Sequence, residues 1–355
     1  MASQIGEKLK VSIFGQSHSE AIGVVIDGLP AGFEIDMEKL RAFMSRRAPG
    51  AGAHTTSRKE ADLPRFISGV VDGITCGSPV CAIIENTNTR SKDYSNLRET
   101  PRPGHADYTA FIKYGLAHDI RGGGHFSGRL TACLCIAGGI CLQYLESRGI
   151  RIAAHVSEIA GVCDRAFDPV SPELSEVLGD APIAVLDASA GERMMKEILA
   201  AKAELDSVGG VVECAAIGVP AGIGEPMFDG IENNIAKTVF GIPAVKGIEF
   251  GAGFSAARMR GSENNDEFCI IGDEVRTKTN NHGGALGGIS SGLPIIFRAA
   301  IKPTPSIARP QASISLSKSE EKTLEIVGRH DPCIVPHAVP VMEAAMAIAI
   351  CDMII

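Results

Sequence analysis

The chain has 355 residues, of which 45% are hydrophobic and 21% charged, a composition typical of a folded protein with a sizeable core. Its formal net charge of -8 argues against a general nucleic-acid-binding protein. An anionic small-molecule ligand is still compatible with that charge, because the charge around a site decides such binding. Residues 1–10 lack the apolar stretch of a signal peptide, and no uninterrupted apolar run reaches membrane-spanning length. We therefore expect a cytoplasmic protein with no membrane contact.

The predicted elements mix strands and helices along the whole chain. Strands are expected at residues 11–14 and 21–29, a helix at 37–47, a polar loop at 50–59, an apolar hairpin at 67–86 and an irregular stretch at 87–105. Further helices are expected at residues 107–114, 130–147, 193–205, 228–240 and 340–355, and further strands at 150–159, 210–218, 245–250 and 293–301. Because strands come in neighbouring pairs and no repeat or linker divides the chain, the pattern predicts a single α+β domain over residues 1–355.

The spacing of cysteine and histidine residues indicates neither disulfides nor a metal site. The ten cysteines lie mostly inside apolar runs without paired CxxC motifs, so we expect them to be reduced and buried. The nine histidines lack HxxxH and HxH spacing, and no carboxylate cluster accompanies them. The sequence therefore predicts no bound metal.

Residues 121–129, Arg-Gly-Gly-Gly-His-Phe-Ser-Gly-Arg, form the most informative segment. Three consecutive glycines let backbone N–H groups approach a ligand, and the two guanidiniums favour an anion. A helix-like apolar run follows, and its positive dipole end would favour an anion at the same place. The segment therefore predicts an anion-binding site, although a surface turn with incidental charges has the same pattern.

Two shorter groupings place an imidazole in a loop. His18 directly follows a predicted strand, where a histidine can donate a proton near neutral pH or form part of a hydrogen-bonded turn. In residues 101–107, prolines fix the backbone around Arg102 and His105, and Asp107 is a natural N-cap for the next helix. Both groupings fit either a binding site or an ordinary turn.

The C-terminal third adds three groupings and one sequence that we set aside. Residues 280–292 offer amides, hydroxyls and bare backbone to a flat heterocycle or its phosphate. Residues 302–306 offer an ammonium and hydroxyls on a proline-stiffened turn. Residues 328–333 combine a guanidinium, an imidazole and a carboxylate. Residues 251–256 fit a GxGxxA dinucleotide fingerprint, but the polar residues after them do not form the apolar helix that this site requires.

Taken together, residues 14–18, 102–107, 121–129, 283–292, 302–306 and 329–333 resemble the chorismate synthase family, in that family's order and along nearly the whole chain. The resemblance implies an α+β sandwich with helices held between antiparallel β-sheets, assembled as a homotetramer. It also implies a cytoplasmic lyase of the shikimate pathway to aromatic amino acids. This enzyme eliminates phosphate from 5-enolpyruvylshikimate 3-phosphate in a 1,4-anti sense to give chorismate, and it requires reduced FMN without net redox change.

The resemblance further implies roles for individual residues. His18 would protonate the departing phosphate, His105 would act near the reduced flavin ring, and Asp331 would assist proton removal through the flavin N5. The implied substrate-binding residues are Arg47, Arg102, Arg121, Arg129 and Arg329. The implied flavin-binding residues are His125, Phe126, Ser127, Ala244, Gly287, Lys302, Pro303, Thr304, Pro305, Ser306 and Arg329.

Several positions depart from the pattern usual in that family. Residues 51–54 lack an arginine that members generally use for substrate or a nicotinamide reductant, and His54 or Arg58 are the nearby substitutes. Gln16, Ser19, residues 125–128 and His337 also carry less common residue types. The sequence leaves open whether NADPH or an external supply reduces the flavin. Two other functions stay open: a flavin carrier or redox sensor without elimination activity, and a flavin oxidoreductase that consumes a reductant.

Overall fold

The computed structural model describes residues 3–48, 62–86, 96–179, 181–326 and 331–355. An N-terminal antiparallel sheet forms one side of the molecule, with its strands in the order β1 (Gln4–Ile5), β2 (Lys10–Gly15), β3 (Ala21–Asp27), β7 (Val80–Glu85) and β4 (Arg65–Ser68). Alternate residues of β3 and β7 are apolar and buried, as expected for a sheet with one face on the core. A small hairpin, β5 (Val70–Val71) with β6 (Ile74–Thr75), lies between β4 and β7 in the chain.

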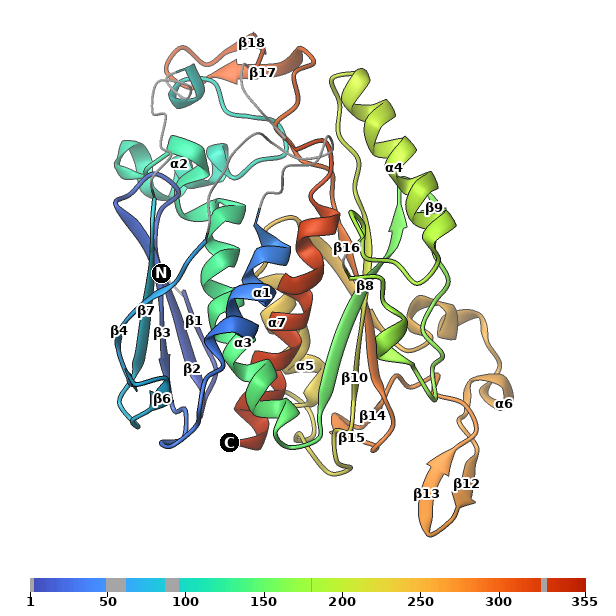
Figure 1. The fold of residues 1–355 in the computed structure, drawn as a ribbon. Coiled ribbons are helices and arrows are strands. Elements are labelled where there is room, and N and C mark those ends of the chain that lie inside the picture. Colours follow the sequence, from blue (N-terminus) through green and yellow to red (C-terminus); the bar gives the residue numbers. More distant parts are fainter. Residues whose placement is uncertain (1–2, 49–61, 87–95, 180, 327–330) are drawn as a thin grey trace.

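A second antiparallel sheet faces the first across the helices (Figure 1). Its strand order is β11 (Val245–Phe250), β16 (Ile295–Ile301), β10 (Gly210–Ile217), β8 (Arg151–Ile159) and β9 (Val162–Cys163). The central strands β10 and β16 are buried along most of their length, because helices cover the inner face and Phe167, Leu174 and Leu186 cover part of the outer one. Helix α4 (Ala188–Ala203) also packs outside this sheet, on β8 and β9.

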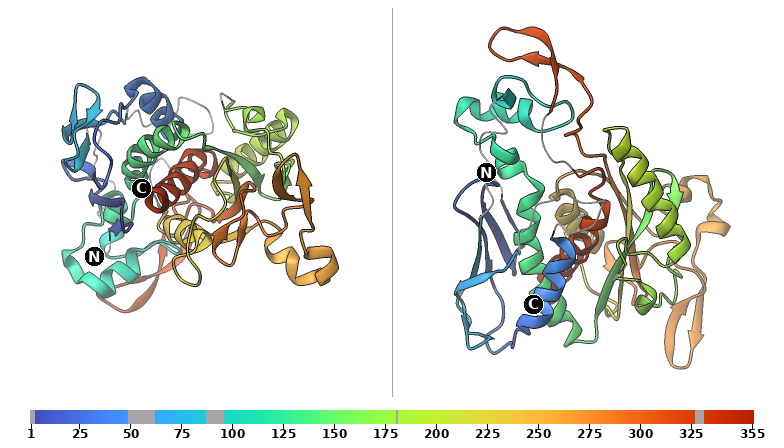
Figure 2. Two further views of the ribbon diagram at one scale, coloured as in Figure 1. Left: turned by 90° about the horizontal axis from the view of Figure 1, so that it is seen from below. Right: turned by 45° about the horizontal axis from the view of Figure 1, so that its top comes forward.

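Helices α1 (Met37–Arg47), α3 (Thr131–Glu146), α5 (Ile231–Phe240) and α7 (Val335–Ile354) lie between the two sheets, and both views in Figure 2 show them there. Small residues let α3 and α7 approach closely, since a Cβ added at Gly138 would lie 2.2 Å from the Ala344 Cβ. Residues 128–146 and α7 are long and apolar enough to cross a membrane by composition, but both are mostly buried within the molecule. They therefore pack as core helices of this sandwich.

The remaining elements lie around this sandwich. Helix α2 (Asp107–Tyr114) and the hairpin of β17 (Gln311–Ser315) and β18 (Glu320–Leu324) lie at the top in Figure 1. Helix α6 (Gly261–Asn264) and the hairpin of β12 (Phe268–Ile271) and β13 (Glu274–Thr277) lie beyond the second sheet, and β14 (Ala285–Leu286) pairs with β15 (Ile289–Ser290). Short 3-10 helices are η2 (Asn96–Arg98), η3 (Gly115–Ala117), η4 (Arg121–Phe126), η5 (Gly128–Leu130), η6 (Leu174–Glu176) and η7 (Gly253–Arg258).

The predicted α+β sandwich with helices between antiparallel sheets is confirmed, with differences at element ends. The sequence predicts a last helix from Pro340, but α7 begins at Val335 and Pro340 lies inside it. Pro336 is tolerated in the first turn, because the N–H that it lacks has no helical partner there. Helix α4 begins at Ala188 instead of residue 193, since Asp187 caps it by accepting from the Ser189 N–H. All ten cysteines are free thiols, but Cys76 and Cys163 are exposed rather than buried.

Candidate active site

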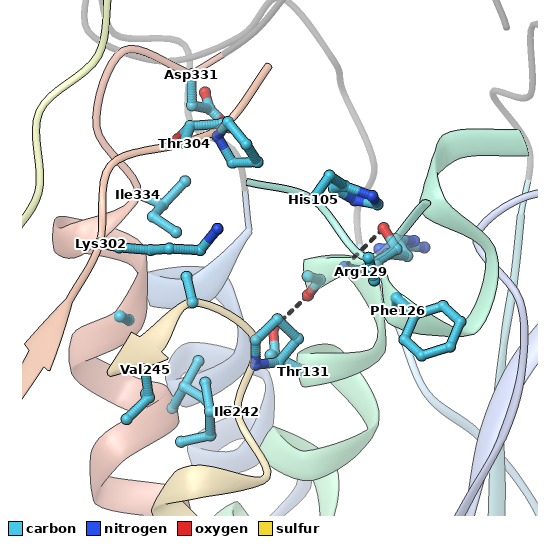
Figure 3. Close-up of a pocket in the computed structure, with 18 of the residues that line it drawn as sticks. His105, Phe126, Arg129, Thr131, Ile242, Val245, Lys302, Thr304, Asp331 and Ile334 are labelled. Carbon is cyan, nitrogen blue, oxygen red and sulfur yellow. Dashed lines mark hydrogen bonds between the residues drawn. The ribbon is translucent and has the colours of Figure 1, made fainter. Parts of the chain in front are cut away.

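A cavity of about 770 Å³ opens between segments that are far apart in the sequence. Its walls come from residues 102–106 before α2, residues 122–131 before and at the start of α3, residues 240–246 between α5 and β11, residues 302–306 after β16, and residues 331–341 at the start of α7. Figure 3 shows Lys302, Thr304 and Asp331 on one side and His105, Phe126 and Arg129 on the other. The volume lies in the range of about 300–1,000 Å³ that is usual for ligand pockets.

Arg102 and His105 line the cavity, and both contact the buried carboxylate of Asp107. The Asp107 carboxylate accepts from Arg102 Nε at 2.7 Å and from Arg102 Nη2 at 2.8 Å, and its Oδ1 lies 2.6 Å from His105 Nδ1. Burial alone would raise the pKa of Asp107, but these partners outweigh it and hold that pKa well below its usual range. The expected N-cap role of Asp107 is wrong. Ala106 is the N-cap of α2, and the Asp107 side chain turns to Arg102 and His105 instead.

A second carboxylate, that of Asp62, joins two further arginines of the cavity, Arg47 and Arg129. The Asp62 side chain is almost fully buried, and its Oδ2 accepts from Arg47 Nε at 3.0 Å. Arg47 Nη2 and Arg129 Nη1 also donate to it, one to each carboxylate oxygen. Both guanidiniums line the cavity. The two guanidiniums and the Asp62 carboxylate together carry one net positive charge beside the cavity.

Two glycines of the 121–129 segment bring His18 and His105 to the same stretch of backbone. Gly122 has φ +60° and Gly123 has φ +85°, in the left-handed region that glycine occupies without strain. A Cβ added at Gly122 would lie 2.5 Å from His18 Nδ1, and one at Gly123 would lie 3.2 Å from His105 Nε2. His18 is 7% exposed and lies directly behind Gly122, which lines the cavity, and His18 Nδ1 is 3.3 Å from Ser17 Oγ.

The opposite wall combines a cation with an apolar floor. Burial, reinforced by the charge of Lys246, lowers the pKa of the Lys302 ammonium, and its Nζ contacts the Gly104 carbonyl. The Lys302 N–H donates to the carbonyl of Ala244 at 3.0 Å, and Ala244 has a φ of +75°, which is uncommon for a residue with a Cβ. The apolar lining residues that we call the apolar floor are Ile242, Val245, Ile334, Ala338 and Val341.

Comparison with known proteins identifies the family. The model of the chorismate synthase family matches residues 9–355. The chain belongs to the chorismate synthase family. It is 48% identical over 347 residues to the chorismate synthase of Thermococcus kodakarensis, covering 98% of this chain and 96% of that relative. It is 44% identical over 353 residues to that of Dehalococcoides mccartyi, covering 99% and 96%. A crystal structure of a chorismate synthase matches with a TM-score of 0.77 at 28% identity, covering 98% of this chain and 92% of that one.

As a chorismate synthase family member the chain is a lyase, and most of the site residues predicted from its sequence face this cavity. The cavity-lining ones are Arg47, Arg102, His105, His125, Phe126, Ser127, Arg129, Ala244, Lys302, Thr304, Pro305, Ser306 and Asp331. Both ring nitrogens of His125 already have protein partners, since Nδ1 lies 2.7 Å from the Gly15 carbonyl oxygen and Nε2 lies 2.8 Å from Ser3 Oγ. Arg329 and the loop of residues 51–54 lie outside the described residues.

Besides His18, three predicted residues that the structure describes do not line the cavity. Arg121 is half-exposed, and its guanidinium makes two 2.8 Å hydrogen bonds to Asp119. Pro303 packs beside Gly209, and Gly287 lies in the open turn between β14 and β15. The roles that the family resemblance implies for these residues therefore stay predictions.

The glycine-rich segment at residues 283–292, which is also part of the resemblance to chorismate synthases, is held at both ends by polar side chains. His282 contacts Asp266 through Nδ1 and lies 2.9 Å from Ser291 Oγ through Nε2. Asn280 Nδ2 donates to the Pro294 carbonyl at 2.8 Å, and its Oδ1 accepts from the Gly284 N–H at 2.9 Å. These bonds fix the shape of a turn that lies away from the cavity.

Sequence reasoning missed Asp62, Thr131 and most of the loop at residues 240–246. Asp62 follows the basic 50–59 loop, and a carboxylate beside several arginines was a usable signal for a charge partner. The 240–246 loop carried no such signal, because its role is an apolar floor that only the packing of α5 against β11 creates. Among the residues that the structure describes, no group of three metal-ligating side chains occurs.

Proposed function

We propose that the chain converts 5-enolpyruvylshikimate 3-phosphate to chorismate by 1,4-anti elimination of phosphate, with reduced FMN required and not consumed. The proposal rests on family membership and on one observation: a single cavity gathers His105, Asp331 and three arginines, and His18 lies directly behind its wall. This combination provides cations for an anionic substrate and proton-transfer groups beside it.

The charge of the cavity suits a substrate with one phosphate and two carboxylates. Arg102 is fixed by Asp107 and by Ser306, whose Oγ accepts from Arg102 Nη1 at 3.1 Å, while Arg47 and Arg129 share Asp62. Guanidiniums held in this way bind planar or tetrahedral anions with little further ordering. We assign Arg47, Arg102 and Arg129 to substrate binding, and Arg121 and Arg329 stay predictions from the family resemblance.

The residues present also fit a flavin. The apolar floor matches a flat heterocycle, and Lys302, Thr304 and Ser306 offer donors for its polar edge or phosphate. Ala244, Phe126 and Ser127 line the same space. When bound, reduced FMN would lend an electron transiently, so that phosphate can leave before the unactivated C–H bond breaks. The protein's own part is orientation and proton transfer.

Proton transfer falls to three side chains. His18, with Nδ1 close to the backbone of Gly122, would donate a proton to phosphate oxygen as the phosphate leaves. His105, with Nε2 close to Gly123, would hold a proton at the edge of the flavin site. Asp331 lines the opposite wall and would assist removal of the ring proton.

An anaerobic assay tests the function. Purified chain, photoreduced FMN and substrate should release phosphate and chorismate in equal amounts, and the flavin spectrum should stay reduced throughout. Oxidised FMN under the same conditions is the control and should give no product. A carrier or redox sensor would bind FMN and release no phosphate, and an oxidoreductase would consume reductant in proportion to product. Either result would reject the proposed function.

Family membership also supports a cytoplasmic homotetramer, with NADPH as one source of electrons for the flavin. These remain proposals that gel filtration with light scattering and an NADPH-dependent flavin reduction assay would test. A monomer at micromolar concentration would contradict the tetramer. Flavin reduction by NADPH without any other protein would indicate that this chain reduces its own cofactor.

A further inference from the structure

Asp107 is buried behind both His105 and Arg102, and neither the family comparison nor the proposed reaction assigns it a role. It is 4% exposed, and its two oxygens are surrounded by donors: the Arg102 backbone N–H at 3.0 Å, Arg102 Nε at 2.7 Å and Arg102 Nη2 at 2.8 Å. It does not cap its own helix. Because burying a carboxylate is costly and this one does not cap a helix, its role is to be found in the contacts that it makes.

The contact with His105 sets which ring nitrogen carries a proton. His105 Nδ1 lies 2.6 Å from Asp107 Oδ1, a separation at which a nitrogen lone pair would be repelled by the carboxylate. Arg102 Nη2 also lies 3.1 Å from Nδ1, but its bond to Asp107 is shorter at 2.8 Å. Asp107 is the closer neighbour and its carboxylate can only accept, which favours a proton on Nδ1 directed at Asp107 over an unprotonated Nδ1 that accepts from Arg102.

The other ring nitrogen, Nε2, lies beside the glycine segment at the cavity, and His105 itself lines the cavity. His105 Nε2 is the ring atom nearest the position of a Cβ on Gly123, on the segment that forms the cavity wall, and the His105 side chain is 16% exposed. With Nδ1 occupied by Asp107, Nε2 is the nitrogen that accepts a proton from a bound molecule or returns it. We propose that Asp107 is a positioning residue that fixes the Nδ1–H tautomer of His105 and directs Nε2 into the cavity.

The same carboxylate couples the histidine to the substrate site. Arg102 is held on one side by Asp107 and on the other by Ser306, so its guanidinium and the imidazole of His105 share one anchor. Loss of the carboxylate would therefore disturb proton transfer strongly and substrate binding to a smaller degree. This consequence for turnover rests on the proposed function, whereas the tautomer does not.

Nitrogen NMR of protein labelled with ¹⁵N-histidine tests the tautomer without any assay of activity. The chain has nine histidines, and the His105→Gln variant identifies the His105 signals by difference. In the unmodified protein, at a pH where His105 is neutral, we expect a protonated Nδ1 and an unprotonated Nε2. A neutral ring with its proton on Nε2 would overturn the proposal whatever the enzyme does.

The Asp107→Asn variant tests the cause. Its amide can donate to Nδ1, so we expect the tautomer to reverse or to become mixed. Ser306→Ala removes only the Arg102 Nη1 bond and should leave the His105 tautomer unchanged. An Asp107→Asn protein that keeps the original tautomer would reject the role of Asp107. If this variant does not fold, the measurement on the unmodified protein still decides.

Turnover gives a second and separable readout. In the anaerobic assay, Asp107→Asn should lower kcat by roughly 10²- to 10⁴-fold and raise KM by a smaller factor, as for other residues that orient a catalytic histidine. Glu176→Gln is the matched control, because Glu176 also pairs with an arginine, Arg165, at 2.7 Å, but on the exposed surface away from the cavity. Loss of turnover equal to that in the control would contradict the positioning role. A chain inactive from the outset would reject the proposed function but not the tautomer.

Discussion

His105 and His155 are both paired with carboxylates, but only one of them can exchange a proton with a ligand. His105 contacts one carboxylate through Nδ1, and its other nitrogen lies next to the cavity wall. His155 is fully buried in the second sheet and uses both nitrogens, with Nδ1 3.1 Å from Asp164 Oδ2 and Nε2 3.0 Å from Glu213 Oε2. A paired histidine is therefore not by itself a catalytic signal.

The difference lies in what the remaining hydrogen-bonding groups do. Asp164 also accepts from the backbone N–H groups of Leu186 at 2.6 Å and Asp187 at 3.0 Å, and Glu213 accepts from that of Phe167 at 2.8 Å. These bonds fasten the segment before α4 onto the outer face of the sheet. The cluster of His155, Asp164 and Glu213 thus contributes stability, whereas His105 lines the cavity. Substitutions at each should separate the two effects.

The largest effect is expected at His18, which is buried like His155 but lies next to Gly122 of the cavity wall. His18→Ala should lower turnover by roughly 10²- to 10⁴-fold, the usual contribution of a positioned acid. FMN binding, followed by fluorescence quenching, should change little, because the described flavin-facing residues are on other segments. His155→Leu is the control, and its turnover per folded molecule should match the unmodified protein. Unchanged turnover of His18→Ala would remove His18 from the proton transfer.

The next largest effect is a loss of stability at His155. His155→Leu leaves Asp164 and Glu213 buried without their shared cation, and removing one partner from such a cluster typically costs about 3–5 kcal/mol. Urea unfolding followed by circular dichroism measures the free energy of unfolding. His118→Leu is matched, because His118 is half-buried and its Nδ1 bonds only the Gly115 carbonyl, so about 1 kcal/mol is expected. Equal losses in the two variants would mean that the cluster is not stabilising.

Much of the fold was predictable from local sequence. The alternation in β3 and β7 and the small-residue apolar run of α3 indicated a sheet on one side and a closely packed helix beside it. The hairpins β12–β13 and β17–β18 were missed, because β12 and β18 are almost entirely exposed and the inward residues of β17 are polar, so no apolar alternation marks them. The extent of α7 was misjudged because Pro340 lies inside the helix rather than at its start.

The site was predictable where sequence motifs carry chemistry and not where packing does. Arg102, His105 and the 121–129 segment stood out by composition, and they face one cavity. Asp107 was interpreted as a cap because local sequence cannot show that its carboxylate turns back to Arg102. The distinction between His105 and His155 was equally invisible, since it depends on Asp164, Glu213 and the elements that bury them. That the whole chain is one domain stays a prediction.

The smallest effect is a pH dependence of stability that comes from the cluster of His155, Asp164 and Glu213 and not from the His105 group. Burial alone would lower the pKa of His155, but Asp164 and Glu213 outweigh it and raise that pKa above its usual value. Arg298 Nη1 lies 3.6 Å from Glu213 Oε1 and is a further charged group beside the cluster. Because the folded pKa is higher than the unfolded one, the stabilisation is complete below about pH 6.5 and is lost as the pH rises through the folded pKa. The free energy of unfolding should fall by up to about 1.4 kcal/mol per pH unit in that window.

In His155→Leu this component of the slope should vanish, whereas a His105→Gln variant should keep it. An identical slope in the unmodified protein and His155→Leu, measured by urea unfolding between pH 6 and 9, would show that His155 does not titrate as a shared cation.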